Sequence, residues 1–175
     1  MSVSQTVNPL LRPSFDKEWK LLLVVASFYK DIADKLVEGA HLELESAGAI
    51  HDVLEVPGAL EVPTAISIAD RCSDFDGYVA LGCVIRGETT HYETVCDNSN
   101  RAIQLLGLQG LCIGNGILTV ENHGQAEVRA DPKGHNKGGA AAIAALHLIS
   151  VAQQLQTKNE EIGFKPTGTV GPLDG

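Results

Sequence analysis

Between residues 21 and 155, short apolar runs alternate with stretches whose apolar positions recur every three or four residues. The unbroken run 21–26 is typical of a parallel strand that is covered on both faces. The stretch after it has helical spacing and ends near Gly48, a residue type that favours helix termination. The same reasoning predicts strands at 21–26, 50–56, 78–85 and 111–120, and helices at 32–44, 60–69, 89–106, 121–130 and 140–155.

The regular alternation of strands and helices determines the expected fold class. Right-handed crossovers join strand–helix–strand units, which makes the strands parallel and places helices on both faces of the sheet. We therefore expect an α/β fold with a four-stranded parallel sheet at residues 19–157. Prolines and glycines interrupt the periodicity outside it, so we expect a flexible N-terminal arm at 1–18 and a flexible C-terminal tail at 158–175.

The charge balance limits the classes of partner. The 175 residues include 13 Lys or Arg and 22 Asp or Glu, a formal net charge of −9 with neutral histidines. A nucleic acid or an anionic membrane surface requires a basic face, so neither is expected as the partner. A small phosphorylated ligand remains compatible, because a few cations and a helix N-terminus are sufficient to bind one phosphate group.

The cysteines and the first residues indicate the compartment. Cys72, Cys83, Cys96 and Cys112 include no Cys-x-x-Cys pair, so we expect no structural zinc site. Thiols scattered in this way are typical of a reducing compartment. The first 20 residues lack the apolar segment of a secretory signal, and the run 21–26 is too short to span a bilayer. These features predict a cytoplasmic protein without a membrane segment.

Candidate chemistry is concentrated in the loops that follow the predicted strands, where ligands bind in open parallel sheets. The loop at 86–91 is the richest, because Gly87 permits close backbone approach and Thr90 with Glu93 forms a capping-box pattern. This pattern predicts a helix beginning at Thr90. His91 would then lie beside any anion bound at the helix start and could transfer protons. Alternatively, the helix is simply capped and its histidine is exposed.

Other loop residues allow two interpretations each. Phe28, after the first strand, fits a core position or a stacking platform for a flat heterocycle. Glu61 falls in the first turn of a helix, where the macrodipole already favours a carboxylate. Arg129 and Lys137 belong to a glycine-rich cluster of cations that lacks the Gly-Lys-Ser/Thr ending of a phosphate loop. The remaining histidines show no i, i+4 pairing suited to a metal.

Several motifs, taken in order, resemble those of the 6,7-dimethyl-8-ribityllumazine synthases. They are Ser27-Phe28-Tyr29, the segments 56–63, 81–92 and 116–122, Arg129, and the turn Gly134-His135-Asn136-Lys137-Gly138. The segment 81–92 is the most specific of them. The resemblance extends over about residues 21–155. It favours the interpretation of His91 as a functional residue over its interpretation as an exposed residue of a capped helix.

The resemblance implies a flavodoxin-like three-layer sandwich and a homo-oligomer with active sites between subunits. Such assemblies are pentamers, decamers or sixty-subunit shells, and Pro9 and Pro13 favour the smaller ones because they would interrupt strand addition to a neighbour. The implied reaction condenses 5-amino-6-(D-ribitylamino)uracil with 3,4-dihydroxy-2-butanone 4-phosphate, releasing phosphate and two waters in riboflavin biosynthesis. No metal or redox cofactor is implied, since an amine and a ketone condense once they are held together and protons are transferred.

The resemblance also assigns roles to individual residues. His91 would be the catalytic residue and transfer protons. The substrate-binding residues would be Phe28 on the pyrimidine ring, Ala59, Leu60 and Glu61 along the ribityl chain, and Cys83, Val84 and Ile85 at the ring edge. The phosphate-binding residues would be Gly87, Glu88, Thr89, Lys137 and, from the adjacent subunit, Arg129.

Three residues depart from the family's pattern. Leu60 replaces a frequent phenylalanine, Glu88 places a carboxylate beside the phosphate loop, and Asn115 stands where the adjacent subunit often supplies an aromatic ring. Loss of that stacking contact should weaken substrate binding by about 1 kcal/mol. Leu60 and Asn115 leave open a non-catalytic flavin or lumazine carrier with slow turnover, whereas a structural role in a shell could coexist with catalysis. A flavodoxin-type electron carrier is disfavoured, because the loop after the first strand is poor in glycines and hydroxyls.

Overall fold

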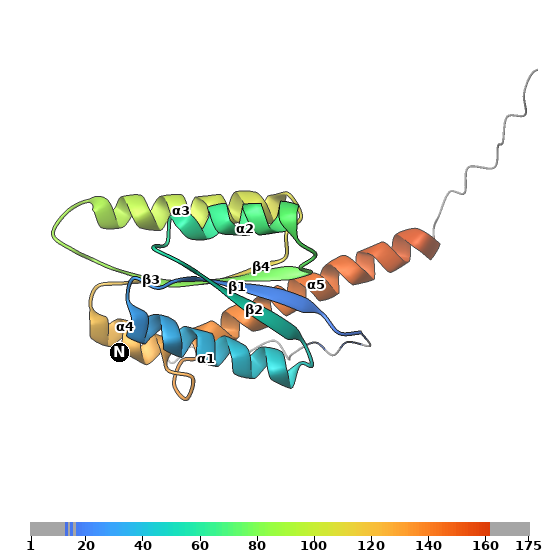
Figure 1. Ribbon diagram of the computed structural model, residues 1–175, viewed down its shortest axis with the longest axis horizontal. Helices are drawn as coiled ribbons and strands as arrows, with labels where there is room; N and C mark the ends of the chain where they lie inside the picture. Colours follow the sequence, from blue (N-terminus) through green and yellow to red (C-terminus); the bar gives the residue numbers. More distant parts are fainter. Residues whose placement is uncertain (1–12, 14, 16, 162–175) are drawn as a thin grey trace, which may run out of the picture.

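The computed structural model describes residues 13, 15 and 17–161, and for residues 157–161 only the helical backbone. Most of the predicted N-terminal arm, and the predicted tail beyond residue 161, lie outside the described residues. Strands and helices alternate along the described chain, and two helices end it (Figure 1). The elements are β1 (Lys20–Ala26), α1 (Lys30–Ser46), β2 (Ile50–Val56), α2 (Glu61–Cys72), β3 (Gly77–Ile85), α3 (His91–Leu108), β4 (Ile113–Val120), α4 (His123–Ala130) and α5 (Lys137–Glu161).

The four strands form one parallel sheet in the order β2-β1-β3-β4. Helices α2 and α3 cover one face of this sheet, and α1, α4 and α5 cover the other (Figure 1). The described chain therefore has three layers. The predicted α/β class, with a four-stranded parallel sheet and helices on both faces, is confirmed.

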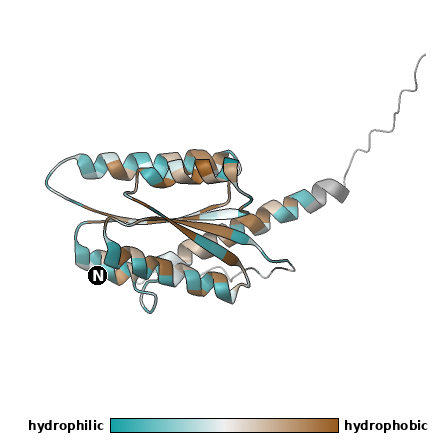
Figure 2. Cartoon of the chain, in the orientation of Figure 1, coloured by the Kyte–Doolittle hydropathy of each residue, from teal (hydrophilic) through white to brown (hydrophobic). Residues whose placement is uncertain are grey.

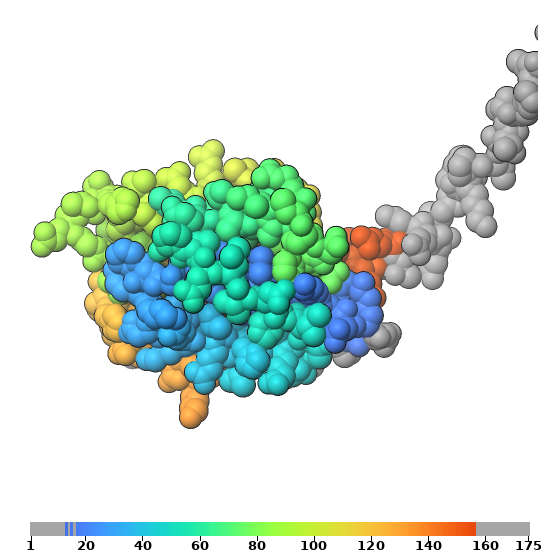
Figure 3. All heavy atoms as spheres, viewed as in Figure 1, coloured from blue at the N-terminus to red at the C-terminus, as the bar shows by residue number. Residues whose placement is uncertain are grey.

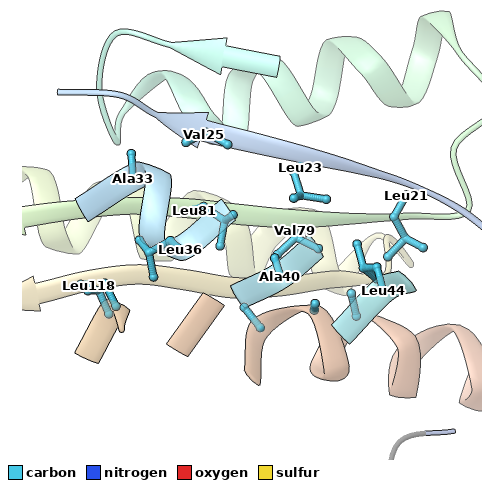
Figure 4. Close-up of a cluster of buried hydrophobic side chains, with 14 of the residues drawn as sticks. Leu21, Leu23, Val25, Ala33, Leu36, Ala40, Leu44, Val79, Leu81 and Leu118 are labelled. Carbon is cyan, nitrogen blue, oxygen red and sulfur yellow. The ribbon is translucent and has the colours of Figure 1, made fainter. Parts of the chain in front are cut away.

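Two apolar layers separate the sheet from its helices. Leu21, Leu23 and Val25 of β1 face α1, where they pack near Leu36 and Leu44 (Figure 4). The alternate side chains of β1 belong to the other layer, beneath α2 and α3: Leu22, Val24 and Ala26. Because both faces of β1 and β3 are covered, these strands are mostly apolar along their length (Figure 2).

Strand β2 has the predicted bounds, but it lies at an edge of the sheet and is largely exposed. Ile50, Val53 and Leu54 are 46%, 48% and 40% exposed, respectively. Apolar side chains on an exposed edge strand are suited to contact with another protein surface. Burial in the core of a single chain therefore explains only some of the apolar residues at 50–56.

The last helix begins earlier and ends later than predicted. α5 covers Lys137–Glu161 instead of 140–155, so it extends into the predicted C-terminal tail. Gly138 is buried where α5 meets α1, and a methyl group there would overlap with the backbone carbonyl of Leu36. Asn136 Oδ1 accepts a hydrogen bond from the Gly139 N–H at 3.1 Å and caps the helix. The glycines thus permit close helix packing and do not end the helix.

Helix α5 also bears on the predicted absence of a membrane segment. By length and composition its stretch Lys137–Gln156 could cross a membrane, and 39% of that stretch is buried inside the protein. The sequence interpretation considered only the run 21–26 and overlooked this helix. Ala141, Ala145, Leu146 and Ile149 of α5 pack in the core. The core position of α5 accounts for these apolar residues.

The contact between α5 and α1 predicts that Gly138→Ala destabilises the protein. The added methyl group would force two helix backbones apart, at a cost of about 3 kcal/mol. Gly107→Ala is the matched control, because nothing lies within 4 Å of the position of its added Cβ. It should change the free energy of unfolding little, or raise it by up to about 1 kcal/mol through helix propensity. Chemical denaturation measures both variants, and equal stabilities would contradict the close contact.

A histidine pair links α1 to β2 and predicts acid sensitivity. His41 Nδ1 and His51 Nε2 lie 3.2 Å apart. Burial, followed by the nearby His41, lowers the pKa of His51 from its usual value. The unfolded chain therefore binds more protons than the folded protein below about pH 6.5, so the free energy of unfolding should fall as the pH decreases through this region.

Denaturation at several pH values, from about pH 7.5 to about pH 5, tests this acid sensitivity. His51→Gln should show a weaker loss of stability on acidification than the wild type, since the half-buried titrating group is gone. His135→Gln, at an exposed loop position, is the control and should keep the wild-type pH dependence. If all three proteins lose stability in parallel, His51 is not responsible.

Candidate functional site

The loops at the carboxyl ends of the strands surround a hollow of about 350 Å³, termed here the first hollow. Parallel strands bring these loops to one edge of the sheet, where the β3–α3 loop projects (Figure 1, Figure 3). Ten of the predicted site residues line the first hollow: Phe28, Ala59, Leu60, Glu61, Cys83, Val84, Ile85, Gly87, Thr89 and His91. Four further lining residues had been assigned no role: Tyr29, Gly58, Tyr92 and Val95.

Phe28 is 74% exposed at the first hollow, so its interpretation as a core residue is wrong. Its ring meets that of Tyr29 edge-on, with the ring centroids 5.0 Å apart and the planes at 73°. Tyr29 in turn packs against the core, which supports the Phe28 ring from one side. An exposed aromatic ring that is held in this way can stack on a flat heterocycle.

The end of β3 offers both a thiol and a strand edge to the first hollow. β1 pairs with β3 as far as Leu81, whereas β4 pairs with it through Ile85. In the described chain, the backbone of residues 83–85 therefore has no strand neighbour on the β1 side. Burial, with a smaller contribution from Asp31, raises the pKa of Cys83 to about 12, so its thiol stays protonated and is a poor nucleophile.

The start of α3 differs from the predicted capping box. Thr90 occupies the N-cap, as predicted, but no side chain caps the helix and Thr90 has φ −68° and ψ 2°. Glu93 pairs with Arg86 instead of reaching back to Thr90. The His91 N–H donates to Thr89 Oγ1 at 3.4 Å. Because Thr90 itself caps no N–H group and the bond of the His91 N–H to Thr89 is long, the first turn of α3 is still suited to bind an anion next to His91.

Of the two carboxylates among the predicted site residues, Glu61 and Glu88, one lines the first hollow and the other does not. Glu61 opens α2, donates its N–H to Gly58 O at 3.2 Å and lines the first hollow. Glu88 is exposed and does not line the hollow. The expected conflict between the Glu88 carboxylate and a phosphate is therefore avoided, and its side chain is not placed to contact a ligand there.

Asn115, Lys137 and Arg129 lie away from the first hollow. Asn115 and Lys137 line a second hollow of about 250 Å³, between β4 and the start of α5. Asn115 Nδ2 donates to Asn100 Oδ1 at 2.6 Å, and its Oδ1 accepts from the Ile117 N–H at 3.1 Å. Arg129 lines neither hollow and donates from Nη1 to Gln125 O at 2.9 Å. Within one chain, these three residues do not meet His91.

One group of side chains has the composition of a metal site. Ligand atoms of Asp31, His123 and Glu127 all lie within 4.8 Å of one another, and all three residues are exposed. His123 Nε2 lies 2.8 Å from Asp31 Oδ2, and Lys35 Nζ lies 3.3 Å from Glu127 Oε1. Both carboxylates thus already have partners across the α1–α4 contact, and this arrangement needs no metal ion to explain it.

For the lining residues of the first hollow without an assigned role, the sequence contained only weak indications of a position at the site. Val95 follows His91 by four residues, so helical periodicity places both on the same face of α3. Tyr92 adjoins His91, and its ring lies under the Arg86 guanidinium, with Arg86 Cζ 4.1 Å from the ring centroid. Neither the stacking nor the pairing of Arg86 is visible from the sequence, because both depend on how the loop folds.

Comparison with known proteins gives the same assignment as the motifs. Residues 18–153 match the family model described as 6,7-dimethyl-8-ribityllumazine synthase. A relative of that name from a Jannaschia species is 52% identical over 168 residues, which are 96% of this chain and 94% of the relative. One from Novosphingobium aromaticivorans is 55% identical over 135 residues, 77% of this chain and 97% of the relative. The chain therefore belongs to the 6,7-dimethyl-8-ribityllumazine synthase family and is a transferase of riboflavin biosynthesis.

Proposed function

We propose that this enzyme condenses 5-amino-6-(D-ribitylamino)uracil with 3,4-dihydroxy-2-butanone 4-phosphate to give 6,7-dimethyl-8-ribityllumazine, phosphate and two waters. One observation carries the proposal: an exposed aromatic ring, an unpaired strand edge and an uncapped helix start with a histidine all face the first hollow. A flat heterocycle with polar edges and a phosphate ester are the ligands that these three features suit.

Each end of the first hollow would hold one part of the substrates. Phe28 would stack on the pyrimidine, and the free backbone edge of residues 83–85 would hydrogen-bond to the ring. Glu61 would accept hydrogen bonds from the ribityl hydroxyls. At the other end, the backbone at Gly87 and Thr89, with the N-terminus of α3, would hold the phosphate. This arrangement brings the amine close to the ketone, which supplies much of the catalysis in a two-substrate condensation.

The chemistry then requires proton transfer more than a nucleophile. The amine attacks the ketone, a C–N bond forms and water leaves; next the C–O bond to phosphate breaks, and ring closure expels a second water. His91, in the first turn of α3, would carry protons to and from these groups. The protonated thiol of Cys83 is not suited to covalent catalysis, which agrees with a reaction that needs no enzyme-bound intermediate.

Charge indicates that the site is completed by a second copy of the chain. Among the described residues, no Lys or Arg lines the first hollow. We infer that Arg129 of a neighbouring copy supplies the charge for the phosphate, with Lys137 and Asn115 from its second hollow beside it. A homo-oligomer, a pentamer or an assembly of pentamers, would place them there. Exposed apolar side chains such as Val53 and Ile68, 48% and 49% exposed, support contact between copies.

Asn115 bears on the alternative of a slow carrier. One of its two amide N–H groups donates to Asn100 and its Oδ1 accepts from the Ile117 N–H, so it offers a substrate no aromatic ring and no more than one further donor. We expect weaker binding from this, not a loss of the reaction, because Asn115 takes no part in proton transfer or in phosphate binding. A carrier would bind the product without accelerating its formation.

Mixing the two substrates with the protein tests the proposed reaction directly. Lumazine absorbance and fluorescence should rise well above the uncatalysed rate. His91→Asn should lower kcat about 100-fold, the lower end of the contribution of general acid–base catalysis, because part of the chemistry proceeds without a protein acid or base. A wild-type rate equal to the uncatalysed rate would leave the carrier as the better interpretation.

Arg129→Ala tests how the phosphate is bound. Removal of a charged hydrogen-bond donor costs about 1.5–3 kcal/mol, so the KM for the four-carbon phosphate should rise about 10- to 100-fold. The KM for the pyrimidine should change little. Arg71→Ala, which removes the same charge from the exposed end of α2, is the matched control and should leave both values unchanged. If Arg129→Ala weakens only pyrimidine binding, the phosphate assignment is wrong.

A further inference from the structure

Arg86 is the first residue after β3, and its side chain joins three segments of the chain. Nε donates to Glu121 Oε2 at 2.8 Å, and Nη1 pairs with Glu93. The guanidinium also lies over the ring of Tyr92, with Cζ 4.1 Å from the centroid. The Arg86 N–H donates to Val120 O at 2.9 Å, so the backbone is held as well. One planar side chain thus connects the end of β3, the first turn of α3 and the turn after β4.

Two of the three segments carry groups that the proposed reaction uses, and the third leads to the start of α4. The chain after Arg86 is the loop with Gly87 and Thr89, which lines the first hollow. Glu93 and Tyr92 lie in the same helical turn as His91. On the third side, Glu121 immediately precedes Asn122, the N-cap of α4, whose Oδ1 accepts from the Gln125 N–H at 3.0 Å. Displacement of Arg86 would therefore loosen the loop and the histidine turn together.

The contacts of Arg86 with Glu93, Glu121 and Tyr92 are better suited to holding these segments in position than to stabilising the fold. The side chains of Arg86, Glu93 and Glu121 are 38%, 48% and 58% exposed, and exposed ion pairs contribute little to the free energy of folding. A guanidinium, however, has donors in a fixed plane, and it can pair with two carboxylates and stack on an aromatic ring at the same time. The hydrogen bond from Arg86 also lowers the pKa of Glu93, which keeps this carboxylate ionised and paired.

Without Arg86, two carboxylates beside the phosphate end of the hollow would lose their counter-charge. Glu93 is two residues from His91, and its negative charge would oppose the binding of a phosphate dianion. The sequence assigned Glu93 to a helix cap, but the structure shows that its partner is Arg86. Arg86 therefore has two separable effects on the site, one geometric and one electrostatic.

We propose that Arg86 is a positioning residue for the reaction, holding the Gly87–Thr89 loop and the His91 turn in place while it neutralises Glu93 and Glu121. This inference rests on the proposed function. The geometric effect acts on kcat, because proton transfer depends on where the imidazole lies. The electrostatic effect acts on the KM for the phosphate substrate, to which displacement of the 87–89 loop adds a smaller increase. The pyrimidine binds at the other end of the hollow and should be affected by neither.

Arg86→Ala separates these effects from a structural role. We expect kcat to fall about 10-fold and the KM for the four-carbon phosphate to rise about 10-fold, with the pyrimidine KM changed less than about twofold. The free energy of unfolding and the assembly size by light scattering should stay close to wild type. Arg101→Ala is the matched control: it removes the same charge from an exposed position on α3 and should leave all four quantities unchanged.

Two further variants distinguish geometry from charge. In Arg86→Ala combined with Glu93→Gln and Glu121→Gln, the released charges are gone, so the phosphate KM should return to within about threefold of wild type while kcat stays low. Arg86→Lys keeps the charge without the planar fork, so it should restore the phosphate KM and only part of kcat.

The proposal is overturned if Arg86→Ala keeps a kcat within about twofold of wild type, or if it loses kcat only together with its fold or assembly. Recovery of full kcat in the triple variant would likewise contradict a positioning role. Failure of the proposed function is recognised separately, because the wild-type protein would then not accelerate lumazine formation. An active wild type with a fully active Arg86→Ala would refute only the role of Arg86.

Discussion

The arrangement depends on one constraint, that both faces of a parallel sheet must be covered. β1 and β3 are buried on both sides, which is why their sequences are almost continuously apolar. Each return to the sheet then needs a crossover helix, and because all the strands are parallel, their carboxyl ends lie at the same edge. That edge has no covering layer, so the loops there form the first hollow and hold Arg86. The location of the candidate site is thus a consequence of how the core is buried.

The same constraint explains which parts of the fold the sequence could predict. β1 and β3 begin within one residue of the predicted runs, because a strand that is buried on both faces must be apolar along its length. Strand 50–56 coincides with β2 although β2 is an exposed edge strand, since Pro57 and Gly58 mark its end. The larger error concerns α5. Gly138 and Gly139 resemble a helix end by propensity, yet both lie within the helix. At Gly138, α1 approaches too closely for a side chain, and at Gly139 a side chain would overlap with the capping residue Asn136. Local preference is overridden by a contact that only the folded chain contains.

In the site, too, the sequence could predict what depends on position along the chain, but not what depends on contacts between distant segments. Phe28 lies in the loop that follows β1, and His91 begins the helix after the loop that follows β3, so their positions along the chain were sufficient to place them at the edge of the sheet. The capping box failed because Arg86 competes for the Glu93 carboxylate, and a charged donor binds a carboxylate more strongly than a neutral one. The partner Glu121 is 35 residues from Arg86. No local pattern indicates a pair of that separation, and it becomes visible only when β3 and β4 lie side by side.

Local charge connects the catalytic proposal with assembly. The net charge of −9 is spread over the surface, and charges beyond about 10 Å are screened at moderate ionic strength. Arg86 contributes little net field, since two carboxylates already pair with it. Within one chain the starts of α2 and α3 both lie at the first hollow, and at the end where a phosphate would bind, the start of α3 supplies a positive field equivalent to about half a charge. A phosphate dianion exceeds this, and on the proposed function Arg129 and Lys137 of a neighbouring copy would supply further positive charge, since a single chain holds them away from His91. On the proposed function, an isolated chain would present the platform for the heterocycle but would bind the phosphate poorly, which is a physical reason to divide the site between copies.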